Sequence, residues 1–374
     1  MGFPAQAFNH VINAHATNDQ RAKDSINEIV DFVGQMPALN FSNHSASLGD
    51  IRSAFYDSSS GTWYVVGANK NARMSTDNGR TWSTSVLTGI GPGTETCEGG
   101  AGDGLGNIVI GTRDRYVFAR VSGTWSRVDA HGSEGDAGLG TVYASRVIRH
   151  PLIWVAVESI SNGGTEMRIA ASTTGTSWTS RVKPVGFAAG AIAIDVNSTS
   201  GRIVFANHDR ASNTLRVSYS DDGSASWSTP VVLAHGTSSG GAPYDALTSV
   251  AHCPNTNTWL LITGETTVTP ACAVFRSTDD GVTWTQVAGL TTACIRNPVA
   301  FGPLWIAMAQ LASTVHEVVY SIDDGATWQR AGVRLPGGSQ PNGVARGGGG
   351  ALIHTQSDVM LSLRSGLPDA GTLS

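Results

Sequence analysis

The stretch that decides the fold is Ser75-Thr76-Asp77-Asn78-Gly79-Arg80-Thr81-Trp82. It recurs as Ser277-Thr278-Asp279-Asp280-Gly281-Val282-Thr283-Trp284 and as Ser321-Ile322-Asp323-Asp324-Gly325-Ala326-Thr327-Trp328. The shared pattern is Ser-x-Asp-x-Gly-x-x-Trp. Its aspartate can accept backbone N–H groups across a bend, and its glycine can take the positive φ that a tight turn requires. The pattern therefore predicts a hairpin turn whose tryptophan anchors the outgoing strand.

Weaker copies of the pattern lie elsewhere in the chain. One runs from Ser220 to Trp227 and is interpreted as carrying one inserted residue; two others end at Trp178 and Trp125. The repeat resembles the Asp-box, or BNR repeat, of sialidase-like β-propellers, and the resemblance extends from about residue 46 to the C-terminus. Because families with unrelated activities share this turn, it indicates the fold and not the function. The resemblance assigns structural roles to Asp77, Gly79, Trp82, Asp221, Gly223, Trp227, Asp279, Gly281, Trp284, Asp323, Gly325 and Trp328.

A second repeated element is a short apolar strand that precedes each turn. Its copies are residues 63–66, 108–110, 153–156, 203–205, 259–262, 304–307 and 351–353. Their spacing is typical of a four-stranded propeller blade. We therefore expect an all-β, seven-bladed β-propeller of four-stranded blades over residues 37–374. The last blade lacks a tryptophan-bearing fourth strand, so residues 37–45 are expected to complete it and close the ring.

Residues 1–36 are predicted to form a separate helical segment. Ala22, Ile26, Ile29, Val33 and Met36 alternate spacings of four and three, as in the seam of a coiled coil. Extended backwards, the seam is interrupted by polar residues. Two interpretations remain open: a coiled coil that makes a homo-oligomer, with a trimer favoured, or an amphipathic helix that lies on its own propeller.

Composition narrows the classes of function. Charged residues make up 14% of the chain and glycine 45 of its 374 residues, which fits many short strands joined by tight turns. The net charge of -5, with no basic run, argues against nucleic acid as a partner. The sequence predicts neither a secretory signal nor a membrane-inserted segment.

The cysteines and histidines do not form a metal-binding pattern. No CxxC pair occurs among Cys97, Cys253, Cys272 and Cys294, and the histidines are scattered, so we expect no metal and no cofactor. A Cys253–Cys272 pairing is an alternative to free thiols.

The resemblance also implies which face binds a ligand. In sialidase-like propellers this is the face opposite the Asp-boxes, formed by loops before the inner strands and after the second strands. Candidate ligand-binding residues in these loops are Asp50, Glu98, Arg113, Arg115, His208, Asp209, Arg210, Tyr244, Asp245, Arg296, Asn297 and Asn342.

A sialidase needs three arginines that clamp a carboxylate, a tyrosine nucleophile with its glutamate, and an acid. The corresponding candidates are Arg113, Arg210, Arg296, Tyr244 and Glu265. The Arg-Ile-Pro motif of sialidases is missing, because the sequence at its position is Asp50-Ile51-Arg52-Ser53.

The sequence leaves three interpretations of function open. The favoured one is a non-catalytic, virion-type receptor-binding protein, in a phage tail or fibre, that recognises a cell-surface glycan. It would be located in the virion and contact other virion proteins; a protein that is not phage-encoded would be secreted or extracellular. The alternatives are a sialidase-like exo-glycosidase and a structural propeller that mediates protein assembly.

Overall fold

The structure is a computed structural model that describes most of the chain between residues 51 and 364. Residues outside the description are 1–50, 92–94, 114–115, 131–140, 162–165, 189, 210–211, 213, 235–246, 266–270, 289, 291–292, 303, 313–314, 336–340, 348–349, 356–359 and 365–374. The described residues form β-strands and contain no helix. None of them belongs to a helix that could cross a bilayer. The predicted helical segment 1–36 and closing strand 37–45 lie outside the described residues.

The strands form seven antiparallel sheets, numbered here in chain order, and within each sheet sequential strands are neighbours. Sheet 1 contains β1 (Ile51–Asp57), β2 (Thr62–Gly67) and β3 (Ala72–Ser75). Sheet 2 contains β4 (Cys97–Gly102), β5 (Ile108–Thr112), β6 (Tyr116–Val121) and β7 (Thr124–Asp129). Sheet 3 contains β8 (Thr141–Arg149), β9 (Trp154–Ser161), β10 (Glu166–Ser172) and β11 (Thr179–Arg181).

The remaining sheets follow the same order. Sheet 4 contains β12 (Gly190–Val196), β13 (Ile203–Asp209), β14 (Thr214–Ser220) and β15 (Val231–Leu233). Sheet 5 contains β16 (Leu247–Cys253), β17 (Thr258–Glu265), β18 (Ala271–Ser277) and β19 (Thr285–Val287). Sheet 6 contains β20 (Cys294–Phe301), β21 (Leu304–Ala312), β22 (Val315–Ser321) and β23 (Gln329–Arg334). Sheet 7 contains β24 (Pro341–Gly347), β25 (Gly350–Thr355) and β26 (Met360–Arg364).

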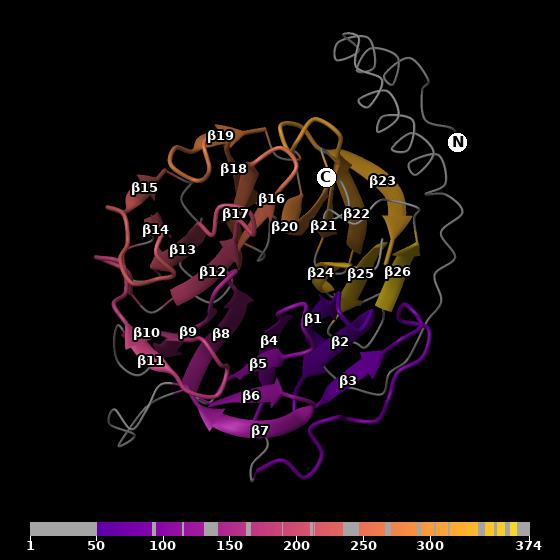
Figure 1. Cartoon of the computed structure of the whole chain (residues 1–374). Coiled ribbons are helices and arrows are strands. Elements are labelled where there is room, and N and C mark those ends of the chain that lie inside the picture. Colours follow the sequence, from indigo (N-terminus) through magenta and orange to yellow (C-terminus); the bar gives the residue numbers. More distant parts are fainter. Residues whose placement is uncertain are drawn as a thin grey trace.

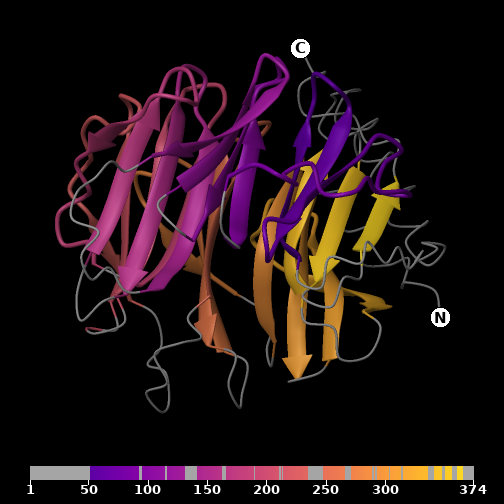
Figure 2. The same cartoon turned by 90° about the horizontal axis from the view of Figure 1, so that it is seen from below.

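The sheets are arranged around a central axis, and their first strands line it (Figure 1). Each first strand contacts the next one along the chain: β1 contacts β4, β4 contacts β8, and the series continues through β12, β16 and β20 to β24. The ring closes because β24 contacts β1. Seen from the side, the strands run between the two faces of the ring (Figure 2). The architecture is an all-β propeller.

The expectation of a seven-bladed propeller with four strands in every blade is wrong, because sheet 1 has only three strands within the described residues. Sheet 7 also shows three strands there, but the segment expected to complete it lies outside the described residues. In sheet 1 the segment after the first turn pairs irregularly with β3. Ser83 N and Val86 N donate to the carbonyls of Met74 and Ala72, as in a strand. In return, Met74 N and Ala72 N donate to the hydroxyls of Ser83 and Ser85 instead of to carbonyls. Serine hydroxyls thus replace the backbone carbonyls as acceptors in two of these four hydrogen bonds. The irregular pairing stops a fourth strand from forming.

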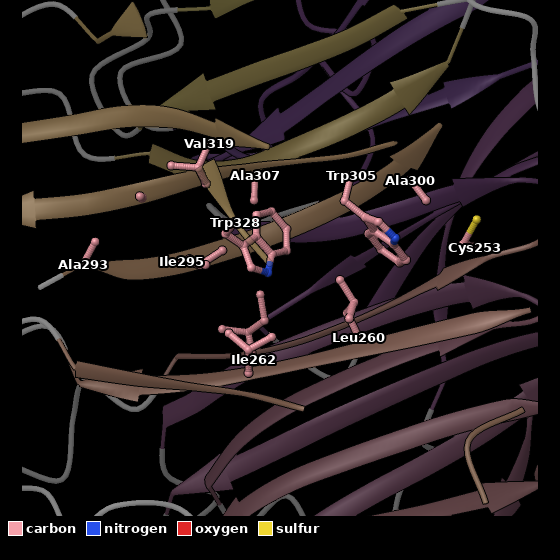
Figure 3. Close-up of a cluster of buried hydrophobic side chains, with 12 residues drawn as sticks. Cys253, Leu260, Ile262, Ala293, Ile295, Ala300, Trp305, Ala307, Val319 and Trp328 are labelled. Atoms are coloured by element: carbon pink, nitrogen blue, oxygen red, sulfur yellow. The ribbon is translucent and has the colours of Figure 1, made fainter. Parts of the chain in front are cut away.

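Burial follows the apolar repeat seen in the sequence. Six of the seven apolar segments lie in the second strand of their sheet, and the segment 153–156 begins one residue before β9. Both faces of these strands are covered by neighbouring sheets. Figure 3 shows one interface of this kind, between sheets 5 and 6. Leu260 and Ile262 of β17 face Trp305 and Ala307 of β21, and Trp328 lies beside them. These residues exclude water between the two sheets.

The turns predicted from the repeat are present, and we call the segments 75–82, 220–227, 277–284 and 321–328 the Ser-Asp turns. In the first, Gly79 N donates to Ser75 Oγ over 2.8 Å and Thr81 N donates to Asp77 Oδ1 over 2.9 Å. The Thr81 hydroxyl also donates to Asp77 Oδ2 over 2.7 Å. The same bonds recur in the segments 277–284 and 321–328. The serine and aspartate side chains therefore satisfy the backbone donors of the bend.

The second Ser-Asp turn corrects the sequence interpretation. Asp222, not Asp221, accepts the bonds from Ser226 N and Ser226 Oγ, at 2.9 and 2.5 Å. Ser224 N donates to Ser220 Oγ over 2.9 Å, the role expected for Gly223. The turn therefore has no inserted residue. Its two left-handed positions, with φ of 66° and 69°, are occupied by glycine and then serine, in the reverse of the usual order.

The glycine of a Ser-Asp turn also rests on the preceding sheet. A Cβ on Gly325 would lie 2.6 Å from Leu260 Cδ2 of sheet 5, and one on Gly281 would lie 2.6 Å from Val204 Cγ2 of sheet 4. The residue before this glycine adds polar links in two turns. Asp280 accepts from Trp259 Nε1 of its own sheet and from Asn197 Nδ2 of sheet 4, over 2.9 and 3.0 Å. Asp324 accepts from Trp305 Nε1 and from the Thr258 hydroxyl of sheet 5. The turns therefore connect successive sheets.

Candidate functional site

Strand direction separates the two faces of the ring. The Ser-Asp turns follow the third strand of sheets 1, 4, 5 and 6. Because neighbouring strands are antiparallel, the starts of the first strands and the ends of the second strands lie on the opposite face. We call this the loop face.

A charged cluster lies at the loop-face end of the axis, and three consecutive sheets contribute to it. Glu98 near the start of β4 accepts from Arg113 Nε, which follows β5, over 2.5 Å. Arg52 Nε of β1 lies 4.0 Å from Glu98 Oε1, and Arg146 Nη1 of β8 lies 3.9 Å from Glu98 Oε2. We call these four residues the Glu98 cluster.

The Glu98 cluster combines a buried anion with accessible cations. The side chain of Glu98 is 8% exposed, whereas those of Arg52, Arg113 and Arg146 are 28%, 32% and 41% exposed. Three guanidinium groups and one carboxylate give the four residues a net positive charge. Desolvation lowers the pKa of Arg146, Glu98 raises it and Arg113 lowers it again. Arg146 remains charged, because an arginine pKa starts far above neutrality, and its positive charge favours an anionic ligand.

Two of the four residues of the Glu98 cluster were predicted from the sequence as ligand-binding candidates. Glu98 and Arg113 were candidates because they belong to loops on the expected face. Arg146 was missed because it lies inside the first strand of sheet 3, opposite Val157, and not in a loop. Arg52 entered the sequence analysis only as part of the segment that stands in place of the Arg-Ile-Pro motif. The sequence signal for Arg52 and Arg146 is the same: each is a charged residue inside a first strand, and the first strands line the axis.

The other candidate arginine, Arg296 of β20, lies in a different environment. It is 9% exposed, and its Nη2 donates to Gln310 Oε1 of β21. Arg113 and Arg296 therefore bind different partners in sheets 2 and 6. The carboxylate clamp implied by the resemblance to sialidases stays a prediction, because its third arginine, Arg210, lies outside the described residues.

Asn297 and Asn342 join the starts of three first strands. Asn297 Nδ2 donates to the Asn342 carbonyl over 2.6 Å, and Asn342 Nδ2 donates to the Ile51 carbonyl over 2.5 Å. Asn297 has a φ of 47°, which asparagine tolerates better than most residues. These bonds connect sheets 6, 7 and 1 on the loop face, so both residues hold the ring closed.

His208 and Asp209 end β13 on the loop face. His208 is 6% exposed. Asp209 Oδ2 accepts from the Ser212 hydroxyl over 2.5 Å and lies 3.6 Å from Arg216 Nη1. This carboxylate shapes the connection between β13 and β14.

Several candidates lie outside the described residues: Asp50, Arg115, Arg210, Tyr244 and Asp245. Glu265 is the last residue of β17, and only its backbone is described. Within the described part of the chain, no group of His, Cys, Asp or Glu side chains could hold a metal ion.

A second charged cluster on the loop face, centred on Glu95, has a structural role. Glu95 Oε1 accepts from Arg127 Nε over 2.7 Å, and Lys70 Nζ lies 3.9 Å from Glu95 Oε2. The Arg127 guanidinium carbon lies 3.3 Å from the centre of the Tyr116 ring. Because Glu95 is buried and paired with two cations, it connects sheets 1 and 2.

Comparison with known proteins identifies the fold. No family model and no curated protein matches the chain. Among solved structures, YCF48 bound to D1 peptide aligns with a TM-score of 0.55 and 14% identity, over 87% of this chain and 93% of that one. YCF48 from Cyanidioschyzon merolae aligns with a TM-score of 0.55 and 12% identity, over 87% and 98%. The BP39L lectin from Burkholderia pseudomallei gives a TM-score of 0.58 and 14% identity, over 83% and 94%.

At these identities the likeness concerns the fold alone. It agrees with the closed ring of sheets, and the chain is a β-propeller.

Proposed function

We propose that this β-propeller is a non-catalytic binding protein that recognises an acidic glycan on a cell surface through its loop face. The Glu98 cluster carries the proposal. Arg52, Arg113 and Arg146 come from three sheets that the closed ring holds in register, and all three side chains are accessible at the axis. A sugar carboxylate would gain charge-assisted hydrogen bonds from planar guanidinium groups.

The finer assignment extends the resemblance of the repeats. In this proposal the Ser-Asp turns are Asp-boxes, and the protein is the receptor-binding component of a phage tail or fibre. Residues 1–36 would associate into a homotrimer and present three propellers together. Multivalency would then convert weak single-site affinity into firm attachment. Light scattering with and without residues 1–36 tests the trimer.

The glycan proposal is tested by calorimetry on the full chain with acidic and neutral oligosaccharides. We expect acidic sugars to bind, and Arg146→Ala to weaken binding about tenfold or more, since one hydrogen bond to a charged group contributes about 1.5–3 kcal/mol. Arg334→Ala is the matched control, because this arginine is 65% exposed on β23, the outer strand of sheet 6. Absence of binding at millimolar sugar, or equal binding by both variants, would overturn the proposal.

A second candidate is a propeller that binds a peptide during protein assembly. YCF48, which shares the fold, was solved with a bound peptide. The Glu98 cluster would suit a carboxylate at a peptide C-terminus as well as one on a sugar. Binding of peptides with a free C-terminus, lost on C-terminal amidation and without any glycan binding, would favour this candidate.

A further inference from the structure

Two cysteines from neighbouring sheets lie against each other on the loop face. Cys272 is the second residue of β18, and Cys294 is the first residue of β20. Ile295 N donates to Cys272 Sγ over 3.2 Å, and Cys272 Sγ donates to the Ala293 carbonyl over 3.5 Å. These two partners flank Cys294 in the sequence. The sulfur of Cys272 is therefore held beside the backbone of Cys294.

The other two cysteines are held elsewhere. Cys253, at the opposite end of sheet 5, donates its thiol to the Gly302 carbonyl over 3.0 Å. Cys97 is fully buried in sheet 2, and burial, with Glu95 and Glu98, raises its pKa to about 12. The alternative Cys253–Cys272 pairing suggested by the sequence is thus not the one that the geometry favours.

We propose that Cys272 and Cys294 form a dithiol that small disulfides oxidise to a cross-link between sheets 5 and 6. All four cysteines are free in this structure, which corresponds to the reduced form. The cross-link would connect the third strand of sheet 5 to the first strand of sheet 6, next to the loop-face residue Arg296.

The two thiols have different roles in the reaction. Cys272 is partly exposed, whereas Cys294 is buried. The neighbouring Cys294 side chain lowers the pKa of Cys272, outweighing desolvation, and the Cys272 side chain together with burial raises the pKa of Cys294. Cys272 is therefore the thiol that attacks, because the thiolate is the nucleophile and must be reachable.

The chemistry proceeds by two exchanges. The Cys272 thiolate attacks oxidised glutathione, forms a mixed disulfide and releases one glutathione thiolate. Cys294 then loses its proton, attacks the Cys272 sulfur and releases the second glutathione. Two protein thiols are oxidised to one disulfide, and one glutathione disulfide is reduced to two thiols. The final bond needs an S–S distance of about 2.05 Å, so the two sulfurs must approach each other when it forms.

The test uses the full chain, oxidised glutathione, alkylation of the remaining thiols and mass spectrometry. Of the four cysteines, we expect two to be alkylated after oxidation and all four after reduction. Cleavage after Glu265, Arg276 and Arg296 separates Cys253, Cys272 and Cys294 into different peptides. The expected product is peptide 266–276 linked to peptide 277–296. The oxidised protein should also melt at a higher temperature, because the cross-link restricts the unfolded chain.

Variants provide matched controls. Cys272→Ser should abolish the linked peptide and the rise in melting temperature, whereas Cys253→Ser should retain both. The peptide map of the unaltered chain decides the matter even if a variant folds poorly. A link that involves Cys253, a stable glutathione adduct on Cys272, or four alkylated cysteines after oxidation would overturn the proposal.

Discussion

Leu352, in the second strand of sheet 7, packs against Gly79, in the Ser-Asp turn of sheet 1: a Cβ on this glycine would lie 3.0 Å from Leu352 Cδ1. Leu352 also shares a buried cluster with Ile51, Trp63 and Val65 of sheet 1. The contact between a turn glycine and the preceding sheet thus extends across the junction of the first and last sheets.

The first prediction tests this junction. Leu352 is 1% exposed, so Leu352→Ala should lower the free energy of unfolding by about 2–5 kcal/mol through lost burial and a residual cavity. Leu105→Ala, at a residue that is 81% exposed, is the control and should change little. Urea denaturation measures both. Equal effects would mean that the ring is not closed by this contact.

The second prediction separates backbone strain from crowding in the turns. Gly325 and Gly332 have similar φ values, 82° and 74°, but a Cβ on Gly325 meets Leu260 whereas one on Gly332 meets nothing within 4 Å. Alanine at either position should lose about 1–2 kcal/mol from the left-handed backbone. Gly325→Ala should lose about 1–3 kcal/mol more through overpacking. Similar melting temperatures for the two variants would contradict the close approach.

The third prediction decides which aspartate supports the second Ser-Asp turn. Asp222→Ala removes the acceptor of the Ser220 hydroxyl and of Ser226 N and should cost about 1–3 kcal/mol, because hydrogen bonds to a charged group are lost. Asp221→Ala breaks an ion pair with Arg202 in which the Asp221 side chain is 58% exposed, so it should cost at most about 1 kcal/mol. The reverse order of stabilities would restore the assignment made from the sequence.

The Asp222 carboxylate also makes the free energy of unfolding depend on pH in the acid range. Desolvation alone would raise its pKa, but the hydrogen bonds from Ser226 and Ser220 outweigh it and hold the pKa below the usual value. A carboxyl whose pKa is lower in the folded state stabilises the fold at neutral pH and loses this contribution as the pH falls below its unfolded value. Asp222→Ala should therefore reduce the acid sensitivity of unfolding, which urea denaturation at neutral and acidic pH measures.

The fourth prediction concerns His354 of β25, which is 3% exposed and close to the bare α-carbon of Gly343. Burial lowers its pKa to about 3, a hydrogen bond with the Ile51 backbone raises it, and Arg146 lowers it further. The folded state keeps this imidazole neutral, while the unfolded chain protonates it below about pH 6.5. Stability is therefore complete above that pH and is lost as the pH falls toward 3.

Between pH 7 and pH 5 this single group should cost about 2 kcal/mol, at about 1.4 kcal/mol for each unit of pH below 6.5. His354→Asn should remove most of that decrease, whatever it does to stability at pH 7. Urea unfolding at both pH values gives the difference. An unchanged decrease in the variant would show that His354 is protonated in the folded protein.

The sequence predicted the parts of the fold that local chemistry determines. The serine and aspartate of the repeat identified the turns, and the apolar segments identified the second strands, because both are short patterns of consecutive residues. The strand count of sheet 1 was missed, since it depends on whether Ser83 and Ser85 offer their hydroxyls in place of backbone carbonyls. Strand propensity does not predict whether a hydroxyl or a carbonyl will accept these hydrogen bonds.

The candidate site was less predictable for a similar reason. Loop position selected Glu98 and Arg113 correctly for the cluster, but it also selected Asn297 and Asn342, whose amides close the ring. Arg146 is near Glu98 only because sheets 2 and 3 meet at the axis. Distances between sheets are a property of the ring, and a linear pattern cannot supply them.

The exchange of glycine and serine at positions 223 and 224 affects how such repeats are recognised. Both central positions of this bend have positive φ, as in the other three Ser-Asp turns, although glycine comes first and the other residue second. The feature that this bend shares with the other turns is a pair of side chains that accept backbone N–H groups, Ser220 and Asp222. A motif search that insists on glycine at the fifth place would discard this copy, whereas one keyed to the flanking serine and aspartate would retain it.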